Sequence, residues 1–220
     1  MFTGESSTKN KLFHRYLTTT RYVQKWYEGD VWDVNDGAQR TLSIVRSMHT
    51  RVATKMSKRC RRLYISVGYG SESKVFCSTI VLFRSLVGLH GWTNDDNDAI
   101  LHFWRTIGYL LGIEYKLNLC HGSYNQVVTP CEKLLHKDYK PVVEKVDSIS
   151  VAMAKNITEA MSMVEPSYTW PALATYIYEL VGLPCPVDMC IIDKICYSLI
   201  YFMMTYLIKF HRICVNKLTR

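Results

Sequence analysis

The chain contains 220 residues, 48% of them hydrophobic and 21% charged, with 27 Lys and Arg against 19 Asp and Glu. This composition excludes a disordered protein and suits one compact domain with a sizeable core. The formal net charge of +8 favours an anionic partner, such as nucleic acid, lipid headgroups or the carboxylates of a cofactor.

The cysteines and the N-terminus bear on the cellular compartment. The cysteines are scattered without a CxxC pair, which indicates neither a zinc module nor a disulfide framework. Residues 1–11, MFTGESSTKNK, lack the apolar stretch of a secretory signal. We therefore expect mostly reduced, structural thiols in a protein of the cytoplasm or of the cytoplasmic face of a membrane, such as the ER.

The hydrophobic pattern predicts an all-α fold, because apolar residues recur at helical spacing and alternating runs are few. The first expected helix covers residues 11–27. The second covers residues 36–61, and its apolar stripe includes a histidine: Ala38, Leu42, Val45, His49, Val52 and Met56. After a polar bridge at 68–73, residues 74–89 are expected to form an apolar helix or another buried segment.

Further helices are expected in the second half of the chain. They cover residues 96–111, 140–164 and 170–181. The acidic turn GWTNDDND (91–98) supplies N-cap residues for the first of them, and Gly112 is its expected C-cap. The step from Glu165 to Pro166 ends the second.

Pro184 and Pro186 separate a helical domain of residues 1–186 from a last segment, residues 187–220. The segment contains the uncharged run CYSLIYFMMTYLI (196–208), which is shorter than the roughly 20 apolar residues of a transmembrane helix. We expect a helix buried in the core. A helix lying on a membrane surface is the alternative, because cationic residues follow the run: Lys209, His211, Arg212, Lys217 and Arg220.

His49 is the polar exception in the stripe of the second helix. A histidine on an apolar face is commonly a hydrogen-bonded structural residue. However, neutral imidazole is also a common ligand of iron and zinc, and Arg46 and Arg51 stand within one turn, where they could meet a cofactor's carboxylates. Because no second His or Cys stands at metal-ligand spacing on this helix, a haem fits His49 better than an isolated metal ion does.

Two other segments carry polar residues in apolar surroundings. Arg15 and Thr19 are four residues apart and share a helix face, although an exposed Arg and an ordinary Thr would give the same spacing. In LHFWRTIGYLLGI (101–113), Gly108 permits close approach of another helix. Arg105 and His102 need partners there, line a cavity or lie on the polar edge of the helix.

Three remaining patterns are less specific. Cys120 and His121 are adjacent but lack a third residue for a nucleophilic triad. The carboxylates of residues 95–98 are expected to cap a helix, because the ligand alternation and terminal Glu of a calcium loop are missing. The basic run RVATKMSKRCRR (51–62) has few aromatic residues, so no specific nucleic acid is expected as a partner, and unspecific nucleic-acid binding through this run stays an open alternative.

Three segments, in the same order, resemble one family: the catalytic domain shared by bacterial latex-clearing protein (rubber oxygenase) and the ER-bound oxygenase of fungal mycophenolic acid synthesis. They are RYLTT (15–19), VRSMH (45–49) and HFWRTIGYLLGI (102–113). These are similar to the family's Arg and Thr pair, its VRxxH run and its HxWRxxGYxLGI segment. The resemblance covers residues 6 to about 120.

The resemblance implies an all-helical bundle around a b-type haem, with His49 as the axial iron ligand. It implies that Arg15 and Thr19 face the cavity near bound dioxygen. From their own positions in the sequence we also expect Arg46 and Arg105 to contact the cofactor. Thr18 stands where rubber-cleaving members have a Lys able to cap the iron.

We therefore expect a haem-dependent oxygenase that uses dioxygen to cleave or oxidise a C=C bond of a hydrophobic, isoprenoid or lipid-like substrate. Rubber-cleaving members have an acidic residue, proposed as the catalytic base, upstream of the Arg of the first segment. At the same spacing this residue would precede Met1, so we expect an N-terminally short member of the family. The alternative is a non-catalytic helical module that has lost haem or activity and binds membranes through residues 196–220.

Overall fold

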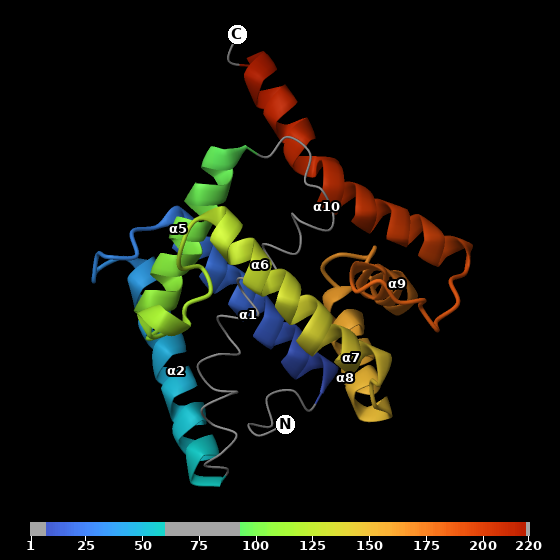
Figure 1. The fold of residues 1–220 in the computed structure, drawn as a ribbon, viewed down its shortest axis with the longest axis horizontal. Helices are drawn as coiled ribbons and strands as arrows, with labels where there is room; N and C mark the ends of the chain where they lie inside the picture. The colour runs from blue at the N-terminus through green and yellow to red at the C-terminus, as the bar shows by residue number, and fades with distance from the viewer. Residues whose placement is uncertain (1–7, 60–92, 219–220) are drawn as a thin grey trace. The chain divides into compact units, whose positions relative to one another are not determined.

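The computed structural model describes residues 8–59 and 93–218 (Figure 1). Within these ranges all regular elements are helical, so the all-α expectation is confirmed. The predicted bridge at 68–73 and the segment 74–89 lie outside the described residues. The elements are α1 (Lys9–Glu28), α2 (Gly37–Arg59), α5 (Asn94–Leu110), the 3-10 helix η1 (Tyr115–Leu117), α6 (Tyr124–Leu134), the π-helix η2 (Leu135–Tyr139), α7 (Lys140–Glu144), α8 (Ser148–Met161), α9 (Trp170–Leu180) and α10 (Ile191–Leu218).

The described residues group into two compact units. We call residues 19–59 and 93–132 the α2–α5 unit, and residues 8–18 and 133–218 the α9–α10 unit. The predicted division after residue 186 stays a prediction, and α10 groups with α9 in one unit.

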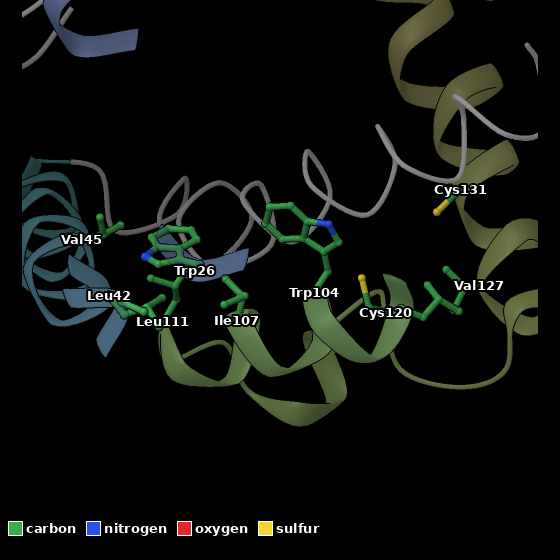
Figure 2. Packing of buried hydrophobic residues seen from close by; sticks show 11 residues of the cluster. Trp26, Leu42, Val45, Trp104, Ile107, Leu111, Cys120, Val127 and Cys131 are labelled. Carbon is green, nitrogen blue, oxygen red and sulfur yellow. The ribbon is translucent and has the colours of Figure 1, made fainter. Parts of the chain in front are cut away.

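The α2–α5 unit has a continuous hydrophobic core (Figure 2). Side chains of α5 point into one layer, with side chains of α2 at one end and those of the following loop and α6 at the other. The spacing of the α5 residues by three and four positions puts them on one helix face, which is why this segment folds as an amphipathic helix. The labelled members are Trp26, Leu42, Val45, Trp104, Ile107, Leu111, Cys120, Val127 and Cys131.

A buried hydrogen bond joins α1 to α2 in this unit. Nε1 of Trp26 donates to Oγ1 of Thr41 over 2.9 Å. The Thr41 hydroxyl donates in turn to main-chain oxygens one turn earlier, Gly37 O and Ala38 O, each at 2.9 Å. These three hydrogen bonds give the Trp26 indole N–H an acceptor and the Thr41 hydroxyl both a donor and acceptors. Both polar groups are therefore buried without an unsatisfied donor.

A residue of the predicted turn caps the N-terminus of α5, and the C-cap is Leu111, one residue before the predicted Gly112. Thr93 is the N-cap, and its side chain and that of Asp96 form a capping box. At the other end Gly112 has φ +91°, a left-handed conformation that favours glycine, and Ile113 N donates to Gly108 O at 2.9 Å. The helix ends within one or two residues of the predicted positions because both ends are encoded locally.

The single helix predicted for residues 140–164 is wrong. The chain forms α7 and α8 there, separated at residues 145–147. Asp147 is the N-cap of α8, and its carboxylate accepts from the backbone N–H groups of Ile149 and Ser150, both at 2.9 Å. These bonds and that from the Ser150 hydroxyl hold the pKa of Asp147 below its usual value. Capping by the aspartate therefore outcompetes continuation of the helical pattern.

No helix is predicted for residues 124–139, yet α6 and η2 occupy this range. Pro130 lies inside α6, although proline has no N–H to donate within a helix. Val127, Cys131 and Leu135 are nevertheless buried at a spacing of four, so one apolar face packs inward. That spacing is the sequence signal for the missed helix.

The expectation that α10 is buried in the core is wrong for most of its described surface. Cys196 and Ile200 are buried against Ala172 and Tyr176 of α9. Another face of the same helix carries exposed apolar side chains, for example Ile192. Among the described residues no helix is long and apolar enough to cross a membrane.

Candidate functional site

His49 lies on α2 at the edge of the closed core. The preceding stripe residues Ala38, Leu42 and Val45 are all buried, whereas His49 and the next stripe residue, Val52, are half-buried. The imidazole therefore sits where the inward face of the helix becomes accessible. The ring is not fully exposed either, since its Nδ1 atom is buried.

Arg46, one turn before His49, reaches the C-terminal end of α5. Its Nη1 donates to Leu110 O at 3.4 Å, and the guanidinium packs beside Gly112. A cation at this end compensates the negative pole of the α5 dipole. Arg46 is otherwise exposed. The contact therefore joins the VRSMH segment to the end of the HFWRTIGYLLGI segment.

Arg105 binds the loop that follows η1. Its Nε donates to Cys120 O at 2.8 Å, and its Nη2 donates to Gly122 O at 2.7 Å. The buried Asn118 completes the arrangement, since its amide donates to Arg105 O at 3.0 Å and accepts from Cys120 N at 3.1 Å. The predicted need of Arg105 for partners is met by main-chain carbonyls rather than by a carboxylate.

Asn118 is an organising residue that sequence reasoning missed. Gly108 leaves room for it, because a Cβ atom at residue 108 would stand 2.8 Å from Nδ2 of Asn118. The close approach predicted at Gly108 is thus made by a loop side chain and not by a helix. A cavity of about 10 Å³ beside Gly108 and Asn118 holds about one water molecule, so it is no substrate pocket.

The aromatic residues of the HFW segment pack against α1. Phe103 stacks on Tyr27 with ring centroids 4.1 Å apart, and Trp104 meets the same tyrosine edge-on at 6.2 Å. Burial raises the pKa of the Tyr27 hydroxyl. His102 is exposed, so it lies on the polar edge of α5 as one of the sequence alternatives stated.

Arg15 and Thr19 are exposed on α1, one helical turn apart. Arg15 belongs to the α9–α10 unit and Thr19 to the α2–α5 unit. Their predicted place near the ligand of His49 therefore stays a prediction. Thr18, the substitute for the family's Lys, is also exposed on this helix.

The cysteines differ in state. Cys120 is disulfide-bonded, so the expectation of reduced thiols is wrong for Cys120. A scattered cysteine pattern cannot reveal a pair that only the fold brings together. Cys131, Cys185, Cys190 and Cys196 are free.

Metal-binding side chains do not cluster in the described part of the chain: no three of its His, Cys, Asp and Glu residues could together hold a metal ion. His121 is exposed and packs on Tyr115 with ring centroids 4.0 Å apart, away from any nucleophilic arrangement in residues 93–218. The donor set predicted from the sequence is therefore one half-buried imidazole, His49, with an arginine, Arg46, one turn away. Such a set fits a haem, which needs only one or two protein ligands.

Comparison with known proteins bears on the same segments. The family model described as "ER-bound oxygenase mpaB/B'/Rubber oxygenase, catalytic domain" matches residues 2–180. Neither a curated protein nor a solved structure gives a significant match. The matched range contains α1, α2 and α5 with their three motif segments and continues through α9. Because the model covers most of the chain, this protein belongs to the ER-bound oxygenase and rubber oxygenase catalytic-domain family.

Proposed function

We propose that this protein is a haem-dependent oxygenase in which His49 is the axial ligand of the iron. Membership of the oxygenase family supports an oxygenase-type activity with dioxygen and a small-molecule substrate. The single observation that carries the choice of His49 is its position on α2, half-buried one turn beyond the closed core. A neutral imidazole in such a place would hold the haem iron.

Arg46 is the proposed partner of the haem carboxylates. It is exposed, stands one turn from His49, and its hydrogen bond to Leu110 O is long at 3.4 Å. A guanidinium with one long hydrogen bond can exchange it for a bidentate contact with a carboxylate. The geometry favours a positioning role for Arg105, because two of its donors are taken by carbonyls of the 118–122 loop.

The proposed substrate is a hydrophobic, isoprenoid or lipid-like molecule. Haem would supply the binding and activation of dioxygen for oxidation or cleavage of a C=C bond. In cleavage the double bond breaks and each carbon takes one oxygen atom, which gives two carbonyl products. Arg15 and Thr19, one turn apart on α1, would provide polar contacts on the side of the reactants. The family description includes rubber oxygenases, which supports an isoprenoid substrate.

The absorption spectrum of the purified protein after haem reconstitution tests this proposal. A Soret band is expected for the wild type and for His102→Ala, because His102 is an exposed histidine on α5. His49→Ala should lose the band or shift it, and free imidazole should restore it. Far-UV circular dichroism checks that the variant is folded. A wild type that binds no haem, or equal spectra for both variants, overturns the assignment.

A second proposal follows from the exposed face of α10: the protein works at the cytoplasmic face of a membrane, such as that of the ER. The family description includes ER-bound members. A helical module that has lost haem but keeps the membrane contact is the alternative function. Membrane binding without a Soret band would favour that alternative, whereas a band together with substrate-dependent oxygen consumption would exclude it.

A further inference from the structure

Helix α10 carries an exposed apolar stripe that the oxygenase proposal does not use. Its members recur at spacings of three and four, which places them on one face of the helix. They are between 38% and 67% exposed. Phe202 and Tyr206 also stack with ring centroids 5.6 Å apart, so the end of the stripe is aromatic. The stripe consists of Ile192, Ile195, Leu199, Phe202 and Tyr206.

The stripe differs from the face that holds α10 in the α9–α10 unit. Cys196 and Ile200 pack against α9, and Asp193 on the same side accepts hydrogen bonds from the Thr169 hydroxyl at 2.8 Å and from Cys190 N at 3.1 Å. The Cys190 side chain, followed by the Thr169 hydroxyl and Cys190 N, holds the pKa of the Asp193 carboxyl below its usual value by hydrogen bonding. Packing of α10 against α9 thus leaves the stripe exposed. Figure 1 shows that the ribbon of α10 continues past α9.

The charges of α10 are of one sign beyond its first turn. Asp193 is the only acidic residue in its sequence, and the cations are Lys194, Lys209, Arg212 and Lys217. A second copy of this helix would bring the same cations and only one acid, Asp193, which already accepts hydrogen bonds within its own chain. Positions flanking the stripe, such as Ser198, also lack the charged residues that fix partners in coiled coils.

We propose that the α10 stripe docks on a membrane surface rich in anionic lipid, with the helix lying in the plane of the headgroups. Apolar side chains along one face, ring-bearing residues at headgroup depth and several cations form the chemistry that such a surface binds. The inference deepens the membrane part of the proposed function. It needs no haem, so its failure would leave the assignment of His49 untouched.

Flotation of the full chain, without added haem, tests the proposal. The vesicles are phosphatidylcholine alone, or a mixture in which about a third of the lipid is phosphatidylserine. Binding is expected for the mixed vesicles, and it should weaken as salt rises. Ile195→Glu and Phe202→Glu should each lower the partition coefficient about tenfold or more, because each replaces a lipid-facing side chain with an anion. Lys209→Glu combined with Arg212→Glu should remove the preference for the anionic lipid.

Ile149→Glu is the matched control. Ile149 is an exposed isoleucine on α8 of the same unit, 75% exposed against 56% for Ile195. This variant should bind vesicles as the wild type does, and circular dichroism should show that all variants are folded. The proposal is overturned if Ile149→Glu lowers binding as much as Ile195→Glu, or if neutral vesicles bind equally well. Absence of binding combined with self-association that Ile195→Glu abolishes would show that a second copy covers the stripe.

Discussion

Arg46 of α2 and Gly112, the residue that terminates α5, lie against one another, since a Cβ atom at residue 112 would stand 3.3 Å from Nε of the arginine. The two residues belong to different motif segments, separated by more than sixty positions along the chain. The contact fixes the end of α5 against the helix that carries His49. We infer that the VRSMH segment and the HFWRTIGYLLGI segment also have a structural role, which is to hold the end of α5 against α2.

Gly112→Ala should therefore destabilise the protein by about 1–3 kcal/mol, because alanine at φ +91° is strained and its Cβ crowds the guanidinium. Urea unfolding measures the change. Gly37→Ala is the matched control: its φ is not positive and the nearest atom to an added Cβ is 3.9 Å away, so its effect should stay within about 1 kcal/mol. Equal destabilisation by both substitutions would contradict the assignment of strain to residue 112.

Arg105→Met should destabilise the α2–α5 unit by about 2–3 kcal/mol, because Cys120 O and Gly122 O lose their charged donor. Thermal unfolding followed by circular dichroism measures this loss. Arg40→Met is a suitable comparison, since exposed Arg40 donates only to Asn35 O at 3.0 Å, and a change within about 0.5 kcal/mol is expected. If the two substitutions have the same effect, the loop does not depend on Arg105.

The α5 segment shows what could be predicted from the sequence. Its length and caps follow from residues within a few positions of each end, namely Thr93, Asp96 and Gly112. The partners of Arg105 could not be predicted, because they are main-chain oxygens 15 and 17 residues further along the chain. A carbonyl group has no sequence signature, so only the folded loop identifies it as a partner.

The candidate site divides in the same way. The position of His49 in an apolar stripe could be predicted, because it follows from the helical spacing of the apolar residues around it in the sequence. The half-buried state of this residue depends on where the core ends, which is a property of packing between distant elements. The exposed stripe of α10 was mistaken for a core face for the same reason: Ile195 and Ile200 are equally apolar, and only the position of α9 determines which of them is covered.

The Trp26 and Thr41 pair allows a double-mutant test of the α1–α2 contact. Thr41→Val should cost about 1–3 kcal/mol, because it leaves the buried indole N–H without an acceptor. Trp26→Phe removes that N–H, so Thr41→Val should cost less in its presence, with a coupling of about 1 kcal/mol. Thr50→Val is the control, since the exposed Thr50 hydroxyl donates only within α2, to Arg46 O. Additive effects of the pair would contradict a direct hydrogen bond.

Because the Cys131 thiol is buried, we expect the free energy of unfolding to depend on pH in the alkaline range. The residue is fully buried, and burial together with the charge of Glu132 raises the pKa of its thiol from 9.0 to about 11. Below pH 9 the thiol keeps its proton in both states, and its contribution to stability is constant. As the pH rises from 9 towards 11, the unfolded chain releases the proton and the folded chain retains it, so the folded state loses stability.

Replacing the thiol isolates this contribution from other groups that titrate in the same range. The difference in unfolding free energy between the wild type and Cys131→Ala should be constant below pH 9 and shrink between pH 9 and about 11. Urea titrations at a series of pH values measure it. A constant difference for Cys131→Ala up to pH 11 would mean that water reaches this thiol in the folded protein.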